Sequence, residues 1–269
     1  MHGAWGGPSS TLWNGPRLRW QVPTDGLKLI WYDRRCAGLS QYETNPFTLE
    51  DLANDAVDLL DYLNIDQAAV IATSAGGPIG IRLAINHPNR VKSLVLLNTG
   101  ASLMSLTPTG VDPADPFVSD RLETVAKRLT LLDLLNSEGI EAAVAASEDE
   151  WRSPPQPAEP DPAFQSFRDN RQLGLDNLSP SELARLALGA LLNMRAQRDK
   201  DLSDELHQVK CPVLIVHGDS DTTVPFAFGE ALATLISEAT LARLVGVGHG
   251  LIVDQQAQSV STDWLRKTV

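Results

Sequence analysis

Short apolar runs alternate with amphipathic segments along the first hundred residues. Three runs rich in β-forming residues lie at 27–33, 68–73 and 91–98. Between them, residues 47–65 and 75–87 carry apolar positions at helical spacing. This alternation predicts parallel βαβ units, in which helices cover both faces of the sheet and the strands are therefore apolar throughout.

The pattern changes between residues 101 and 208, where no segment has the pattern of a strand. Residues 119–135 and 179–198 predict helices, whereas 147–162, which is rich in proline and acidic residues, predicts an exposed irregular loop. The strand and helix alternation then returns, with elements predicted at 211–218, 226–237, 239–247 and 254–267. The simplest organisation is an α/β core of residues 1–100 and 209–269, interrupted by a helical lid insertion at 101–208.

Two helix beginnings are marked by capping residues. Thr48, the second residue of the segment 47–65, is the candidate N-cap of its helix, and Asp51 follows three residues later in the manner of a capping box. Ser179 has the same relation to Glu182, with Pro180 in the first turn.

Ser74 lies where the apolar run 68–73 gives way to a helical segment. A sharp strand-to-helix turn exposes the side chain of its central residue above the carboxyl edge of the sheet. Such a turn needs small residues on either side, because its backbone is crowded. Ala72 and Gly76 supply them. The segment resembles the nucleophile elbow G-x-S-x-G of the α/β-hydrolase family, with alanine in place of the first glycine. Taken alone, the pentapeptide also fits an ordinary serine at a helix N-terminus.

A serine hydroxyl needs a base within hydrogen-bond reach, and that base needs an orienting acid. Among the five histidines, His249 follows a late predicted strand in a glycine-rich turn. His87 ends a helix, His207 lies in a polar segment, and His217 lies inside an apolar strand, where a hydrogen-bonded core histidine is expected.

The acid is expected on the loop that follows the strand before His249. Residues 217–225, HGDSDTTVP, supply Asp219 and Asp221. The resemblance favours Asp221, since the family pattern is Gly-x-x-Asp with a proline a few residues later. Asp219 is the alternative.

An oxyanion hole needs two backbone N–H groups directed at the developing negative charge. One is the amide of Ala75, directly after Ser74. By resemblance, the other belongs to the residue after a His-Gly pair, which in MHGAWGG is Ala4. Residues 32–40, YDRRCAGLS, resemble the family turn D-R-R-G-x-G-x-S, with Cys36 in the place of the first glycine and a structural role expected for it.

The resemblance also sets an expectation for the beginning of the sheet. Members of the family have two or three strands before the His-Gly turn, and Met1 stands in their place. The sheet is therefore expected to lack its N-terminal strands, which would leave an unpaired edge and remove support from Ala4.

Composition narrows the class of ligand. A net charge of −12 gives no basic surface for nucleic acid or an anionic membrane. Cys36 and Cys211, the two cysteines, form neither a disulfide framework nor a metal-ligand pattern. No apolar stretch is long enough to span a bilayer and no signal-peptide pattern is present, so a cytoplasmic location is expected.

Together these residues predict a serine hydrolase that cleaves a small-molecule ester, lactone or related acyl bond and needs neither metal nor organic cofactor. Ser74 would attack the carbonyl, His249 would transfer the proton, and Asp221 would orient the imidazole. A serine at the elbow argues against the haloalkane dehalogenase and epoxide hydrolase branches of the family, which use an aspartate.

Other functions fit parts of the sequence. A proline iminopeptidase-like aminopeptidase would use a lid carboxylate from Glu148, Asp149 or Glu150 to bind a free amino terminus, although simple solvation of these acids is the favoured interpretation. A cofactor-free haloperoxidase-like activity would use the same triad. A non-catalytic small-ligand binding protein would keep the pocket alone. The sequence predicts neither the substrate nor the oligomeric state.

Overall fold

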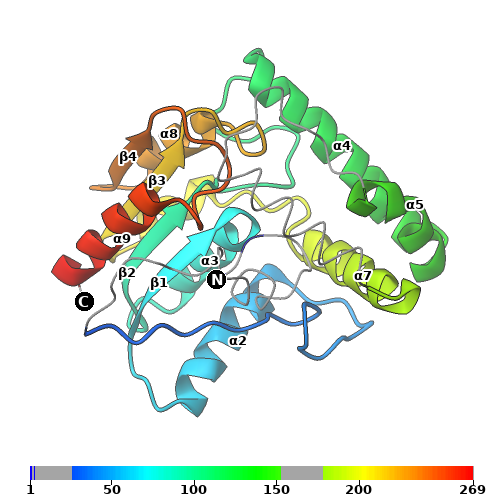
Figure 1. Ribbon diagram of the computed structural model, residues 1–269, viewed down its shortest axis with the longest axis horizontal. Coiled ribbons are helices and arrows are strands. Elements are labelled where there is room, and N and C mark those ends of the chain that lie inside the picture. Colours follow the sequence, from blue (N-terminus) through cyan, green and yellow to red (C-terminus); the bar gives the residue numbers. More distant parts are fainter. Residues whose placement is uncertain (2, 4–25, 153–177, 269) are drawn as a thin grey trace.

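A four-stranded parallel sheet lies at the centre of the computed structural model, which describes residues 1, 3, 26–152 and 178–268 (Figure 1). Its strands are neighbours in chain order: β1 (Ala68–Thr73), β2 (Val91–Leu97), β3 (Val213–Gly218) and β4 (Thr240–Leu244). Thr73 lies opposite Leu97, and Leu97 lies opposite Val216. The strands therefore end close together along one edge.

Alternate strand residues divide the core into two layers. One face packs against α2 (Leu49–Tyr62), α3 (Gly77–Asn86) and α8 (Phe226–Leu235), and the other against α9 (Gln255–Thr268). In β2, Leu94 and Leu96 belong to the first layer, and Val95 and Leu97 to the second. Burial on both faces explains why the inner strands β2 and β3 are apolar at successive positions.

Both predicted capping boxes are confirmed. Thr48 Oγ1 accepts a hydrogen bond from Asp51 N at 3.2 Å, and the Asp51 carboxylate accepts one from Thr48 N at 2.8 Å. The same reciprocal pair joins Ser179 and Glu182 at the beginning of α7 (Pro180–Ala196).

Helices occupy the described part of the chain between β2 and β3. They are α4 (Pro116–Ser137), α5 (Ile140–Arg152), α7 and the 3-10 helix η2 (Ser203–Gln208), and these described residues include no strand. Figure 1 shows α4, α5 and α7 together on one side of the sheet. Of the helices that the structure describes, none is long and apolar enough to cross a bilayer.

Two predicted elements are wrong. Residues 27–33 form no strand, because β-forming side chains produce a strand only where a neighbouring backbone completes the ladder. At the outer edge of β1, Thr73 N donates instead to Met1 O at 3.2 Å. Residues 147–152 belong to the end of α5 rather than to a loop, since glutamate has a good helix propensity and an acidic run does not by itself prevent a helix.

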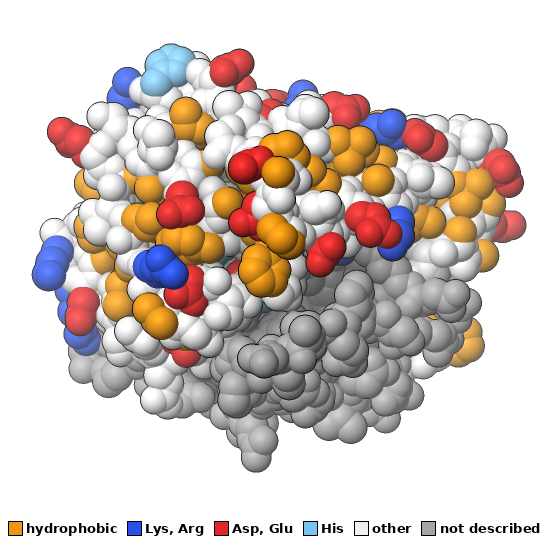
Figure 2. Space-filling model, turned by 90° about the horizontal axis from the view of Figure 1, so that it is seen from above, with side chains coloured by type: hydrophobic (Ala, Val, Ile, Leu, Met, Phe, Trp, Pro, Cys, Tyr) orange, Lys and Arg blue, Asp and Glu red, His pale blue; other side chains and the backbone are white. Residues whose placement is uncertain are grey.

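The surface matches the acidic composition. Figure 2 shows one face on which acidic and apolar side chains are interspersed over the described residues, with the basic ones scattered. This pattern is typical of a solvated surface rather than of a site for a polyanion.

Arg82 of α3 joins the core to the segment that returns from the inserted helices. Its guanidinium donates two hydrogen bonds of 2.7 Å to the Glu205 carboxylate in η2, and it lies 3.4 Å from Glu50 of α2. The Arg82 side chain is 9% exposed and that of Glu205 is 36% exposed. The hydrogen bonds from Arg82 hold the pKa of Glu205 below its usual value.

Glu205→Gln should lower the free energy of unfolding at neutral pH by about 1–2 kcal/mol, less than for a fully buried pair because Glu205 is partly solvated. The lowered pKa means that the contribution of Glu205 is present above its unfolded pKa and is lost as the pH falls through its folded pKa. The difference between wild type and variant, measured by urea unfolding, should therefore shrink as the pH falls from neutrality to below about 4.3, the usual pKa of a glutamate.

The matched control is Glu123→Gln, which breaks an exposed pair with Lys127 in α4. It should leave the unfolding midpoint unchanged. An equal effect of the two substitutions would show that the Arg82 pair does not join the two segments.

Candidate active site

Ser74 occupies a tight turn between β1 and α3. It begins the 3-10 turn η1 (Ser74–Gly76), and its φ of +48° lies in the left-handed region that residues other than glycine rarely adopt. Small residues surround it: a Cβ on Gly80 would lie 2.7 Å from the Ala72 Cβ, and one on Gly3 would lie 3.1 Å from the Ser74 Cβ. The turn therefore has the crowding that the sequence pattern predicts around Ala72.

His249 lies between Ser74 and Asp221. Its Nε2 is 3.0 Å from Ser74 Oγ, and its Nδ1 is 2.7 Å from Asp221 Oδ2. The structure thus brings together three residues that the sequence singles out at the ends of different strands, with Ser74 and His249 lying 175 residues apart. An imidazole that donates Nδ1–H to a carboxylate has Nε2 free to accept a proton from the hydroxyl.

The two candidate acids have different surroundings. Asp221 is buried, and its Oδ1 accepts hydrogen bonds from Thr223 N at 2.8 Å and Val224 N at 2.9 Å, while Oδ2 faces His249. Asp219 instead accepts hydrogen bonds from Gly246 N at 2.7 Å and from Arg243 Nε at 3.0 Å.

Burial acts to raise the pKa of Asp219, but the hydrogen bonds from Gly246 and Arg243 outweigh it and hold that pKa below its usual value. Asp219 therefore closes the turn after β4, and Asp221 is the carboxylate that contacts the imidazole.

His217 is a buried core residue, as its apolar strand predicts. Its Nε2 lies 2.8 Å from the carbonyl oxygen of Val224, to which it donates, and 3.7 Å from Asp221 Oδ2. Burial lowers the pKa of His217, which favours the neutral form of its ring. His217 is therefore a buried polar neighbour of Asp221.

Three residues that sequence reasoning missed hold the turns of the site. Asn98 is fully buried, and its side chain donates to Gly248 O at 2.9 Å and accepts from Gly218 N at 3.0 Å. It thereby ties the loop of His249 to β3. The sequence feature from which Asn98 could have been predicted is the polar pair Asn98-Thr99, directly after the apolar run of β2.

The other two contact the elbow itself. Thr99 Oγ1 donates to Ser74 O at 2.8 Å, and Gln197, just after α7, donates from Nε2 to Ala75 O at 3.0 Å. Nothing in the pattern around Gln197 indicates this contact.

Of the two expected oxyanion donors, Ala75 lies in η1 and Ala4 lies outside the described residues. The first N–H groups of a helix have no partner within it, and the amide of Ala75 is one of these groups in η1.

Cys36 has a structural environment. It is buried and adopts a φ of +55°, a conformation that suits the glycine of the resembled turn. Its Sγ accepts a hydrogen bond from Glu43 N at 3.2 Å. Burial raises the pKa of the thiol, which disfavours the nucleophilic thiolate.

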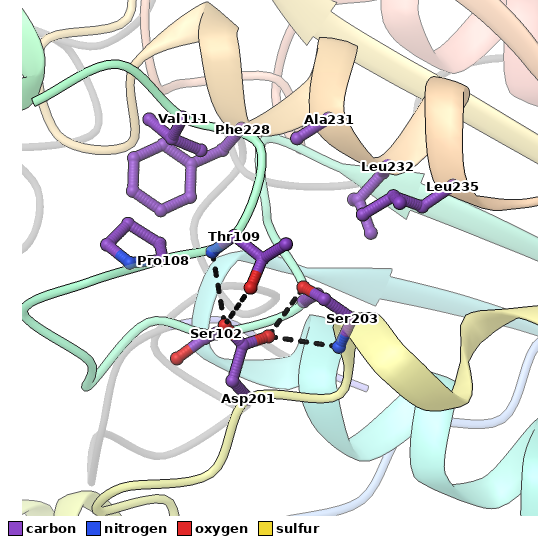
Figure 3. A pocket seen from close by; sticks show the side chains of 11 residues that line it. Ser102, Pro108, Thr109, Val111, Asp201, Ser203, Phe228, Ala231, Leu232 and Leu235 are labelled. Carbon is purple, nitrogen blue, oxygen red and sulfur yellow. Dashed lines mark hydrogen bonds between the residues drawn. The ribbon is translucent and has the colours of Figure 1, made fainter.

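A small pocket lies away from the triad residues, between α8 and the segments that flank the inserted helices (Figure 3). Asp201 is its acidic residue. The carboxylate accepts hydrogen bonds from the backbone and hydroxyl groups of Thr109 and Ser203. These contacts give Asp201 the role of fixing the loop rather than of binding a ligand.

The sequence of the chain is similar to those of known proteins over most of its length. Residues 2–256 match the sequence profile of a family described as the alpha/beta hydrolase fold. The chain is 30% identical over 254 residues to "Putative carbamate hydrolase RutD" of Caulobacter sp. (strain K31), covering 92% of this chain and 82% of the relative.

Two further proteins extend the comparison. The chain is 24% identical over 217 residues to "3-oxoadipate enol-lactonase 2" of Acinetobacter baylyi, covering 81% of this chain and 70% of that protein. The crystal structure of a hydrolase from Pseudomonas aeruginosa PA01 is similar with a TM-score of 0.59 at 26% identity, covering 87% of this chain and 78% of that one.

Gly77→Ala should lower the free energy of unfolding by about 1–3 kcal/mol, which is typical of overpacking. A Cβ at this position would lie 1.9 Å from Thr99 Oγ1, so either Thr99 or the elbow must move. At an uncrowded helix position the same substitution stabilises. Urea denaturation measures the effect, and an unchanged or higher stability would contradict the close contact.

Proposed function

The chain belongs to the α/β-hydrolase fold family and is a hydrolase, and we propose that it is a serine hydrolase acting on a small-molecule ester, lactone or related acyl compound. The observation that carries this proposal is the continuous pair of hydrogen bonds from Ser74 through His249 to Asp221. This arrangement supplies a nucleophile, a base and an orienting acid.

In the proposed reaction Ser74 Oγ attacks the substrate carbonyl while His249 Nε2 takes the hydroxyl proton. Asp221, hydrogen-bonded to Nδ1–H, stabilises the resulting imidazolium. The imidazolium returns the proton to the leaving alcohol as the carbon–oxygen bond breaks, which leaves an acyl group on Ser74. Water then repeats the sequence, with His249 as its base, and releases the carboxylic acid and free Ser74.

Attack on the carbonyl gives a tetrahedral intermediate whose oxygen carries a negative charge. We assign the stabilisation of this charge to the backbone N–H groups of Ala75 and Ala4. The position of Ala75 in the first turn of η1 supports its role. Gly3, the neighbour of Ala4, lies against Ser74, and its lack of a side chain allows this approach.

The proposed substrate class is supported by what the names of two relatives have in common. One is named for carbamate hydrolysis and the other for hydrolysis of an enol-lactone. Both reactions begin with attack on a carbonyl that carries a heteroatom leaving group, which is the chemistry of the proposed triad. We expect this chain to take a small acyl substrate of that kind.

We further propose that residues 101–208 form a lid over Ser74 and shape the acyl pocket. The hydrogen bond from Gln197 to Ala75 O supports this role, since it places the end of α7 against the elbow. In the aminopeptidase alternative the lid acids matter most. Glu148, Asp149 and Glu150 lie on α5, but their side chains fall outside the described part of the structure.

Ser74→Ala should abolish both hydrolysis and covalent labelling by a fluorophosphonate probe, with a loss on the order of 10⁴ to 10⁶ in kcat. Wild type should be labelled at Ser74, and mass spectrometry of the labelled peptide identifies the site. A set of p-nitrophenyl esters and lactones, run beside amino-acid anilides, tests the substrate class. A variant that keeps more than about a tenth of wild-type turnover would exclude Ser74 as the nucleophile.

Asp221→Asn should reduce kcat by about 10⁴-fold, because an amide at this position favours the wrong imidazole tautomer. Asp219→Asn is the matched control and should change kcat by less than about threefold, since Asp219 contacts the turn after β4 rather than His249. The kcat values of the two purified variants decide between them, and the reverse ranking would assign the acid role to Asp219.

A further inference from the structure

We propose that Thr99 is a positioning residue for the oxyanion hole: its hydroxyl holds the carbonyl of Ser74 and thereby fixes the direction of the Ala75 N–H. This inference rests on the proposed function, because it presupposes that an oxyanion forms beside Ser74. Thr99 itself acts through the peptide group and needs no contact with the substrate.

The contact is short, and the residue that donates it is buried. Thr99 Oγ1 lies 2.8 Å from Ser74 O, and Thr99 is 1% exposed. Thr99 follows the end of β2, directly beside the end of β1, because the pairing of Thr73 with Leu97 brings the two strand ends together. The hydroxyl thus reaches the elbow from a position two residues after β2, a strand that is paired on both sides in the sheet.

The acceptor belongs to the peptide group that carries the proposed donor. The carbonyl of Ser74 and the N–H of Ala75 are parts of one planar trans peptide, so they point in opposite directions and rotate together. A hydrogen bond that fixes the carbonyl therefore fixes the N–H as well. It also polarises the peptide, which makes the N–H a stronger donor.

The elbow is shaped to admit this hydroxyl. Ser74 O also accepts the backbone N–H of Gly77, which is the ordinary bond of the 3-10 turn, so Thr99 supplies a second donor to the same oxygen. Gly77 has no side chain at the point where a Cβ would lie 1.9 Å from Thr99 Oγ1. Close approach of Thr99 to this carbonyl therefore depends on glycine at position 77.

The hydrogen bond from Thr99 matters because the backbone of Ser74 is strained. With a φ of +48°, Ser74 is held outside the regions that its backbone prefers, and relaxation would rotate the peptide that follows. The hydrogen bond from Gly77 N–H constrains the carbonyl of Ser74 only from within the turn. The Thr99 bond constrains it from the sheet, so the N–H keeps its direction while the tetrahedral intermediate forms and collapses.

Thr99→Val tests the proposal because valine has nearly the shape of threonine without the hydroxyl. The second-order rate of fluorophosphonate labelling should fall by about 10- to 100-fold, less than the full loss of an oxyanion donor because the N–H is misdirected rather than removed. Affinity for phenylboronic acid, whose tetrahedral adduct places an oxygen in the same position, should fall by a similar factor. The pH midpoint of labelling should not move, since the contacts of His249 are untouched.

Thr99→Ser keeps the hydroxyl and should restore labelling to within about threefold of wild type. The control is Thr262→Val, which alters a buried threonine in α9 and should leave the labelling rate unchanged even if stability falls. If Thr99→Val does not fold, the ratio of Thr99→Ser to Thr99→Ala isolates the hydroxyl in the same way. A ratio near one overturns the proposal.

The outcomes separate this inference from the proposed function. Wild type that is neither labelled nor active on any ester, lactone or anilide would overturn the serine hydrolase proposal and this one with it. Wild type that is labelled at Ser74, beside a Thr99→Val variant that reacts within about twofold of it, would overturn the role of Thr99 alone.

Discussion

The left-handed backbone of Ser74 is the constraint on which the arrangement of the site depends. A residue other than glycine adopts this conformation at a cost of about 1–3 kcal/mol, so the surrounding structure must impose it. Here β1 is held in the sheet on one side of the turn and α3 is packed against β1 and β2 on the other. In an extended conformation Ser74 would continue the strand and turn its side chain towards a helix layer instead of towards His249.

The second requirement is that the strands end together. The register places Thr73, Leu97 and Val216 side by side, so the residues that follow each of these strands meet above one edge of the sheet. A parallel sheet collects polar groups in this way at the carboxyl ends of its strands. Each strand end has its own part: β1 is followed by the hydroxyl, β2 by Asn98 and Thr99, and β3 by the carboxylate.

Ser74, Asp221 and His249 are candidates that the sequence alone suggests, because each combines a reactive side chain with a local pattern: small neighbours, a following proline or flanking glycines. The structure places the three side chains within hydrogen-bond distance of one another. Thr99 and Gln197 were not predictable, because a side chain that donates to a backbone carbonyl needs no particular neighbours in sequence. The helix caps at Thr48 and Ser179 were readable since their partners lie three residues away. Residues 27–33 misled because a strand depends on a backbone partner elsewhere in the chain.

Helix-rich sequence between β2 and β3 separates two strands that lie side by side, and Asn98 contacts Gly218 across 120 residues of chain. Closing so long a loop costs little more than closing a short one, since each doubling of length adds only about 0.6 kcal/mol. The same separation slows folding, because contacts between residues distant in sequence form slowly. The β1–α3–β2 unit, contiguous in sequence, is therefore expected to assemble before β3 and β4 deliver the acid and the histidine. The segment between β2 and β3 can therefore change length in evolution with little effect on the free energy of unfolding. The order in which the strands assemble stays the same.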